Sequence, residues 1–303
     1  MNSVKKLIVL LGPTASGKTA LAIQLAQRLK TEIISADSRQ IYREMDIGTA
    51  KPSVEELAAV KHHFINTHSI TEVYDAGQYG RDALALIETL FKRFDTLILC
   101  GGSGLYLKAV IDGFDDMPDI PDGVRKKINE AYETHGLSWL QEQVEKADPE
   151  FFAQVDKKNP HRLIRALELN QVTGQVMSTF RKSKKKEHDF EIIKIGLDPD
   201  REELYQRIDQ RMDIMIAAGL FEEAERLYPL RNHNALQTVG YQEIFGFMDG
   251  LYDRDEAIRL LKRNSRRYAK RQLTWFKRDP EIRWYTTETF DHIIKDSKFQ
   301  VQN

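Results

Sequence analysis

Residues 12–19 have the sequence "GPTASGKT", and this stretch decides the fold. It matches the pattern G-x-x-x-x-G-K-[ST], in which backbone N–H groups surround phosphate oxygens, a lysine neutralises charge, and a Ser or Thr hydroxyl binds Mg²⁺. An apolar run, residues 7–11, precedes it, and "KTALAIQLAQRLK" with helical spacing of apolar residues continues from its last two residues. Because strand, loop and helix occur in this order, we interpret the match as a phosphate site and not as a chance turn.

Further apolar runs predict a parallel sheet around this loop. We expect strands at residues 31–37, 62–68, 95–102 and 190–197, with helices between them, for instance over 76–93. Strands that alternate with helices at this spacing form parallel sheets with helices on both faces. The predicted fold class is therefore α/β, with a P-loop NTPase-like core that binds its ligands at the carboxyl ends of the strands.

The pattern changes at residues 115–123, which are rich in Pro, Asp and Gly. Only helical patterns follow, up to a charged linker that precedes the strand at 190–197. We therefore predict that residues 1–117 and 188–303 form the catalytic core, with basic helices towards its C-terminal end. Residues 118–187 are predicted to form an all-helical insertion domain.

Composition describes an ordinary globular protein near charge neutrality. With 45 basic and 46 acidic side chains, bulk charge does not favour a nucleic-acid partner, so evidence for one must be local. The single cysteine, Cys100, excludes a disulfide framework and fits a reducing cytoplasm. The first apolar run is shorter than a secretory signal requires, and no run approaches the ~18 apolar residues of a membrane span. We therefore expect a cytoplasmic protein with no membrane partner.

Asp37 ends the second predicted strand, where parallel topology places it near the bound phosphates. Most phosphate-loop NTPases also carry a metal-holding acid after a later strand, but here "TLILC" is followed by Gly101 and Gly102. This absence argues against ATP hydrolysis. Position alone leaves Asp37 as a base facing a phosphate-bound electrophile, as the substrate-binding acid of a small-molecule kinase, or as a turn cap.

An ordered set of motifs follows the loop: "ISADSRQIYREMDIGTAKP" (34–52), "GGSGLYLKA" (101–109), "HRLIRALE" (161–168), "LYQRIDQRMDIMIAAGL" (204–220), "QTVGYQE" (237–243) and "KRQLTWFKR" (270–278). Together with the loop, these motifs resemble the tRNA dimethylallyltransferases, the IPP transferase family. The matches span essentially the whole chain. The resemblance implies transfer of a dimethylallyl group from dimethylallyl diphosphate to N6 of the adenosine 3′ to the anticodon, tRNA position 37, in tRNAs that read codons starting with U. It also implies a need for Mg²⁺ and release of diphosphate.

The resemblance further implies roles for individual residues around the loop. The diphosphate-binding residues would be Gly12, Pro13, Thr14, Ala15, Ser16, Gly17, Lys18, Thr19 and Arg211. The catalytic residues would be Asp37, Thr19 and Arg211. Asp37 would take the proton from the adenine amine, and Thr19 would hold Mg²⁺. Arg211, one helical turn from Arg207, would stabilise charge on the leaving diphosphate, unless these arginines are paired with nearby acids.

Transfer to a base in a stacked anticodon loop requires that the base turn out into the protein. The tRNA-binding residues implied by the resemblance are Asp37, Ser38, Arg39, Gln40, Ser103, Arg125, His161, Arg162, Leu163, Ile164, Arg165, Gln237, Gly240, Tyr241, Arg266, Arg267, Lys270, Arg271 and Lys277. Residues 262–278 contain eight basic side chains and no acid, and four-residue spacing groups most of them in a helical stripe that favours phosphate binding. The aromatic residues of this segment are either core anchors or platforms for stacking. The basic cluster at 161–165 could equally belong to a lid over the diphosphate.

Two other functions stay open at this point. A small-molecule or nucleotide kinase would use the loop, Asp37 and an arginine-bearing helical lid, but it has no need of the basic stripe. An RNA-binding module, non-catalytic or driven by ATP, is disfavoured by the missing acid after "TLILC". For the main interpretation, the expected partners are a tRNA anticodon stem-loop and dimethylallyl diphosphate, and the chain is expected to act as a monomer.

Overall fold

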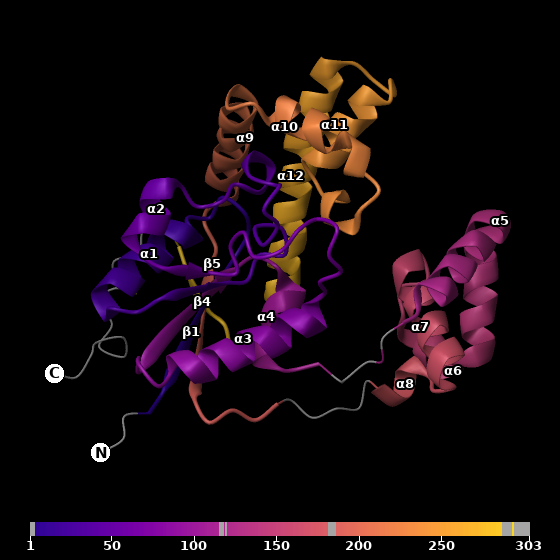
Figure 1. Cartoon of the computed structure of the whole chain (residues 1–303), viewed down its shortest axis with the longest axis horizontal. Helices are drawn as coiled ribbons and strands as arrows, with labels where there is room; N and C mark the ends of the chain where they lie inside the picture. The colour runs from indigo at the N-terminus through magenta and orange to yellow at the C-terminus, as the bar shows by residue number, and fades with distance from the viewer. Residues whose placement is uncertain (1–3, 115–117, 119, 181–185, 287–292, 294–303) are drawn as a thin grey trace. The chain divides into compact units, whose positions relative to one another are not determined.

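The computed structural model describes residues 4–114, 118, 120–180, 186–286 and 293. Across the described residues the chain divides into two compact units, Met1–Ile111 with Glu187–Asn303, and Asp112–Lys186 (Figure 1). Both structural boundaries lie slightly before the predicted ones. The short segments that the structure does not describe include most of residues 115–119 and part of the charged linker at 181–186.

A parallel sheet forms the centre of the first unit. In the described part of the chain it has six strands, in the spatial order β3 (His62–His63), β2 (Ile33–Ser35), β4 (Thr96–Gly101), β1 (Lys6–Leu11), β5 (Glu191–Leu197) and β6 (Arg283–Tyr285). Alternate residues of β1 enter two different hydrophobic cores: Leu7 and Val9 pack on one face of the sheet, and Ile8 and Leu10 on the other. Each such burial contributes roughly 1.5–3 kcal/mol. The predicted α/β fold with both faces covered is confirmed.

Helices supply both cores. On the face of Ile8 lies α1 (Lys18–Leu29), and on the face of Leu7 lie α3 (Ala76–Leu90) and α4 (Gly104–Ile111). After β5 come α9 (Arg201–Ala217), α10 (Leu220–Leu227), α11 (Tyr241–Met248) and α12 (Arg254–Phe276), which pack on one another (Figure 1). The connections contain α2 (Val54–Ala59) and the 3₁₀ helices η1 (Ile47–Thr49), η2 (Tyr228–Leu230) and η3 (Asn234–Leu236).

The second unit contains only helices among its described residues, as predicted. They are α5 (Asp122–Ala147), α6 (Pro149–Gln154), α7 (Pro160–Thr173) and α8 (Met177–Phe180), with a core of their own around Leu140, Val144 and Phe151. Gly136 interrupts α5 with φ 76° and ψ −170°, so α5 consists of two helical stretches that meet at this glycine.

The predicted strand at 62–68 is wrong beyond His63. Phe64 and Asn66 have φ values of 60° and 56°, and a strand cannot continue through left-handed backbone. The second strand is also shorter than predicted, Ile33–Ser35 within 31–37. The apolar pattern shows which segments enter the sheet, but backbone pairing decides where each strand ends.

None of the helices in the described part of the chain is long and apolar enough to cross a membrane.

Candidate active site

The phosphate-binding loop connects β1 to α1. Gly12 has φ 151°, and a Cβ atom there would lie 2.8 Å from the carbonyl oxygen of Leu197, so a side chain has no room. Gly17 begins α1 in the left-handed conformation, with φ 91°, and no side chain caps the helix. The first turn of α1 therefore presents N–H groups and the positive end of the helix dipole to an anion, as the sequence predicts.

A cavity of about 450 Å³ opens at the carboxyl ends of β1, β2 and β4. It is lined by loop residues Thr14–Thr19, by Asp37 after β2, and by Arg211 on α9. A smaller space of about 100 Å³ is also lined by Thr14, Asp37 and Arg211, together with apolar side chains that include Met212 and Val239. The fold thus brings the predicted diphosphate-binding and catalytic residues together.

Lys18 is a half-buried cation held by the loop itself. Its Nζ donates to the carbonyl oxygen of Pro13 at 2.5 Å and to Ser16 Oγ at 3.4 Å. The pKa of Lys18 is lowered to about 8, mainly by burial and also by Arg211, while Cys100 and Asp37 act in the opposite direction. An anion bound in the cavity would raise this pKa again, because it favours the charged form.

Arg211 faces the loop from α9. Its guanidinium donates to Thr14 Oγ1 and to the carbonyl oxygen of Ala50, both at 3.4 Å, and burial lowers its pKa. Among the described residues no carboxylate forms an ion pair with Arg211. The alternative that this arginine is neutralised by a nearby acid therefore does not apply to it. Arg207 does pair with Glu203, at 3.4 Å, although it also lines the larger cavity.

Of the three roles that the sequence left open for Asp37, the structure shows the turn cap, and it also places the side chain at the cavities. One carboxylate oxygen, Oδ1, accepts from the backbone N–H groups of Arg39 at 2.9 Å and Gln40 at 3.3 Å, which is the bonding of a turn cap. The same side chain lines both cavities. The cap holds the carboxylate in place, and its position allows it to meet a ligand.

Neighbouring side chains support this turn. Ser103 Oγ accepts from the backbone N–H of Ser38 at 2.9 Å and donates to Ser38 Oγ at 3.2 Å. Gln40 donates through Nε2 to the carbonyl oxygens of Thr49 and Ala50, at 3.2 and 3.1 Å. Ser103 and the amide of Gln40 therefore hold the backbone around Asp37.

Glu223, a carboxylate of α10 that is 1% exposed, is not among the site residues predicted from the sequence. It accepts from the backbone N–H groups of Asp46, Ile47 and Gly48 at 2.8–3.1 Å, and from the hydroxyl of Tyr241 at 2.5 Å. These bonds hold η1, and the carbonyl of the next residue, Ala50, accepts from both Gln40 and Arg211. A signal was available, because Glu223 lies at helical spacing on the apolar face of α10, where an acid needs partners.

The assignment of Tyr241 to tRNA binding requires correction. Its side chain is 0% exposed and its hydroxyl is bound to Glu223, so it has no surface to offer to RNA. Its neighbours in the motif differ: Gly240 lines the smaller cavity, and Gln237 is exposed, with its Nε2 donating to the carbonyl oxygen of Arg231 at 2.6 Å.

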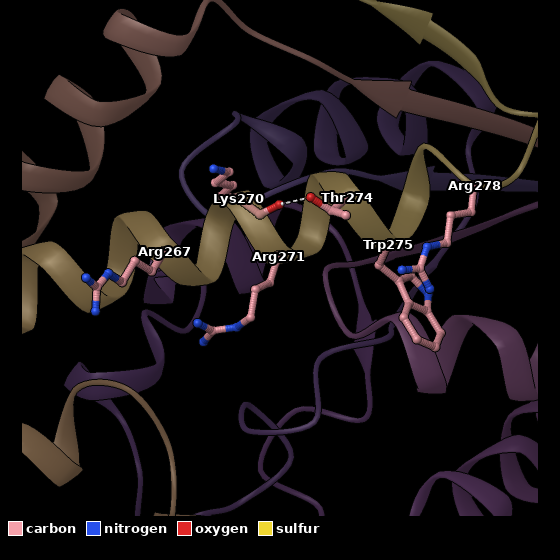
Figure 2. Close-up of a pocket in the computed structure, with 6 residues that line it drawn as sticks. All are labelled: Arg267, Lys270, Arg271, Thr274, Trp275 and Arg278. Carbon is pink, nitrogen blue, oxygen red and sulfur yellow. Dashed lines mark hydrogen bonds between the residues drawn. The ribbon is translucent and has the colours of Figure 1, made fainter. Parts of the chain in front are cut away.

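The basic stripe of α12 divides into two groups, which sequence spacing could not separate. Asp213 and Asp209 of α9 pair with Lys262 at 2.6 Å and with Arg266 at 2.5 Å. In contrast, a hollow of about 410 Å³ is lined by Arg267, Lys270, Arg271, Thr274, Trp275 and Arg278, and Figure 2 shows these six side chains. Lys277 pairs with Asp198 at 2.8 Å. The acids that seemed absent come from elsewhere in the chain.

The aromatic residues of this segment also separate. Phe276 is a core residue, 4% exposed, whereas Trp275 lines the hollow and packs against Gly104, where a Cβ atom would lie 2.4 Å from its Nε1. Tyr268 lines both site cavities, and burial raises its pKa to about 12. Trp275 and Tyr268 can therefore still contact a nucleobase of the RNA.

The remaining predicted tRNA contacts lie in the second unit. Glu168, 2% exposed, pairs with Arg125 at 2.7 Å and with Arg165 at 3.3 Å. His161 and Arg162 are exposed, and Ile164 packs against the core of this unit. Leu163 is 0% exposed, so its assignment to tRNA binding is corrected: its side chain fills the core.

Known proteins resemble this chain over nearly its whole length. The family described as IPP transferase matches residues 40–279. A tRNA dimethylallyltransferase of Cytophaga hutchinsonii is 52% identical over 281 residues, which are 93% of this chain and 92% of the relative. A solved tRNA isopentenylpyrophosphate transferase of Bacillus halodurans is 37% identical, with a TM-score of 0.70 over 96% of this chain and 95% of that one. A eukaryotic dimethylallyltransferase, solved acting on tRNA, is 28% identical, with a TM-score of 0.77 over 93% of this chain and 74% of that one.

Proposed function

The chain belongs to the IPP transferase family, and we propose that it transfers a dimethylallyl group from dimethylallyl diphosphate to N6 of the adenosine at tRNA position 37. One observation carries this proposal: a single cavity joins the phosphate-binding loop, Arg211 and the carboxylate of Asp37. Because all of these residues come from one chain, we propose that it acts as a monomer, and its tRNA substrate implies a cytoplasmic location.

The donor's diphosphate fits the loop end of the cavity. The N–H groups at the start of α1, Lys18 and Arg211 can stabilise the negative charge that develops as the bond from C1 to the diphosphate oxygen breaks. The smaller space, partly apolar and shared with Asp37, suits the hydrocarbon. The hydrocarbon would then extend from the loop towards the carboxylate.

Mg²⁺ is part of the proposal, and the donors present fit it. Mg²⁺ binds proteins through few side-chain oxygens and takes the rest of its ligands from phosphates and water. Thr19, which carries a hydroxyl, lines the loop cavity. When bound, the ion would neutralise charge on the diphosphate.

The acceptor needs a base because the exocyclic amine of adenine shares its lone pair with the ring. As N6 bonds to C1 of the donor, its proton becomes acidic, and a carboxylate within about 3 Å can take it. Asp37 lines both cavities and is held by its turn, so we assign it as that base. The electron pair of the C1–O bond leaves with the diphosphate.

The RNA reaches this site when the target base turns out of the anticodon loop. The hollow on α12 offers basic side chains for the phosphates and Trp275 for stacking. A small-molecule kinase would have no use for this surface, and the relatives named above also favour the transferase.

The test is incubation of the protein with an unmodified tRNA anticodon stem-loop, dimethylallyl diphosphate and Mg²⁺, followed by mass spectrometry of the nucleosides. We expect one dimethylallyl group per stem-loop, none without Mg²⁺, and none on a stem-loop with guanosine at the target position, because guanosine lacks the N6 amine. Phosphoryl transfer from ATP to a small metabolite, with no prenylated RNA, would overturn the proposal.

A further inference from the structure

Gln272 joins two loops that the sheet brings side by side. Its Oε1 accepts from the backbone N–H of Thr14 at 2.9 Å, and its Nε2 donates to the carbonyl oxygen of Gly102 at 2.9 Å. Thr14 belongs to the loop after β1 and Gly102 to the loop after β4, and these strands are neighbours. The side chain is 8% exposed, so both bonds are protected from water.

An amide is the side chain that these two partners require. One of them is a donor and the other an acceptor, so a carboxylate could serve only Thr14 and a lysine only Gly102. A neutral group also avoids placing a negative charge beside the proposed diphosphate site, where it would repel the ligand.

The contact explains why a glycine follows β4 where many phosphate-loop enzymes have an acid. A Cβ atom at Gly102 would lie 2.5 Å from Nε2 of Gln272, and one at Gly101 would lie 2.1 Å from the carbonyl oxygen of Ala36. No side chain fits at either position while Gln272 and β2 keep their places. The amide of α12 thus occupies space beside the end of β4.

Thr14 is held from two sides. Gln272 binds its backbone N–H, and Arg211 donates to its hydroxyl at 3.4 Å. Given the proposed function, on which this inference rests, we propose that Gln272 is a positioning residue that sets the conformation of the phosphate-binding loop for the diphosphate. It acts through Thr14 and Gly102, not by contact with the reacting atoms.

The location of Gln272 ties this role to α12. The helix buries Ala269, Gln272 and Phe276 on one side, and presents Arg271 and Trp275 to the hollow in Figure 2. Loss of the amide alone leaves the flanking apolar contacts that keep α12 in place. The loop should therefore respond to a change at Gln272, while the RNA-facing side should not.

The first test replaces Gln272 with Met, which has similar length and no amide. We expect the Kd for inorganic diphosphate with Mg²⁺, measured by calorimetry, and the KM for dimethylallyl diphosphate to rise about tenfold, because a buried N–H loses its partner. The KM for the stem-loop should change less than about twofold. Gln27→Met, on the exposed face of α1, is the matched control and should leave all three values unchanged.

A double-mutant cycle tests the contact with Gly102 independently. Gly102→Ala should weaken diphosphate binding about as much as Gln272→Met, because the new methyl group displaces the amide. Gln272→Ala removes the amide and leaves room for the methyl group. In this background, Gly102→Ala should raise the Kd for diphosphate by less than about twofold. If Gln272→Met fails to fold, the cycle still decides the question.

The inference is wrong if Gln272→Met binds diphosphate within twofold of the unchanged protein, or if the effects of Gly102→Ala and Gln272→Ala are independent. Equal losses of diphosphate and stem-loop affinity, with a lower melting temperature, would indicate a purely structural role and would also overturn it. Failure of the proposed function gives a different result, namely an unchanged protein that binds no diphosphate or forms no prenylated RNA.

Discussion

The cavity at the strand ends and the exposed side of α12 both carry positive charge, but they hold it differently. In the cavity, Lys18 and Arg211 are half-buried, and among the described residues neither has a carboxylate in an ion pair. On α12, Lys262 and Arg266 are paired with acids of α9, whereas Arg267 and its neighbours line an open hollow.

The difference follows from the cost of burying charge. A half-buried cation without a counter-ion is destabilised, as the lowered pKa of Lys18 shows, and a bound diphosphate would remove that cost. A solvent-exposed cation is already stabilised by water, so its contribution to binding is weaker for each charge and is screened by salt. The cavity is therefore suited to one small, highly charged ligand, and the hollow to a long phosphate backbone.

The largest effect is expected for Asp37, the acid that faces the half-buried cations. Asp37→Asn should lower kcat about 10²–10⁴-fold, because the amide cannot accept the proton, while the Kd for diphosphate changes little. Single-turnover prenylation measures the first quantity and calorimetry the second. Glu88→Gln, which removes an exposed carboxylate of α3, is the control. An unchanged rate would remove Asp37 as the base.

Neutralising the hollow should have the next largest effect. The triple variant Arg267→Gln, Lys270→Gln and Arg271→Gln should weaken stem-loop binding about 10–100-fold and reduce the slope of log K against log salt by about 2–3. Filter binding over a range of salt concentrations measures both. Diphosphate affinity should stay the same. A slope equal to that of the unchanged protein would show that this hollow is ordinary surface.

The half-buried lysine predicts a pH dependence that the surface cations cannot show. Below pH 8 Lys18 is charged with or without ligand; above pH 8 the free protein loses this proton, and binding of an anion must restore it. Diphosphate affinity should therefore fall as pH rises from 8 to 9, by up to about tenfold. In Lys18→Arg the side chain stays charged, so the loss of affinity that comes from deprotonation of Lys18 should be absent. Titration of the diphosphate itself affects both proteins equally. Parallel pH profiles would contradict the prediction.

The smallest effect is expected for the cations that α9 already neutralises. Lys262→Gln with Arg266→Gln should change the salt slope of stem-loop binding by less than about 1, and the free energy of unfolding by no more than about 1 kcal/mol for each partly exposed pair. The same filter-binding series and a urea titration measure these values. A slope change as large as that of the triple variant would show that RNA displaces the acids of α9.

Much of this site could be predicted because its central part is contiguous. Residues 12–19 carry the glycines, the lysine and the hydroxyl in one stretch, and the flanking patterns place a strand before them and a helix after them. Parallel topology then brings Asp37 to the same end of the sheet. The resemblance of the motifs added Arg211, and the structure places its guanidinium against Thr14.

The residues that were missed act across long sequence separations. Gln272 is 258 residues from Thr14, and Glu223 is 175 residues or more from the backbone that it holds. Helical spacing from Ala269 and Phe276 places Gln272 on the buried face of α12, but nothing in the neighbouring sequence identifies Thr14 and Gly102 as its partners. Tyr241 lies in a quoted motif, yet its side chain is part of the core.

The sequence by itself determined the loop, the class of sheet and the helical insertion, because backbone conformation and helix or strand periodicity depend on residues that are close in the chain. Only the tertiary structure decided which cations on α12 are neutralised and how Gln272 and Glu223 hold the site. It also determined that there is no space for a side chain at Gly101 or Gly102. Each of these depends on burial and on a partner from another element, and a partner exists only after the chain has folded.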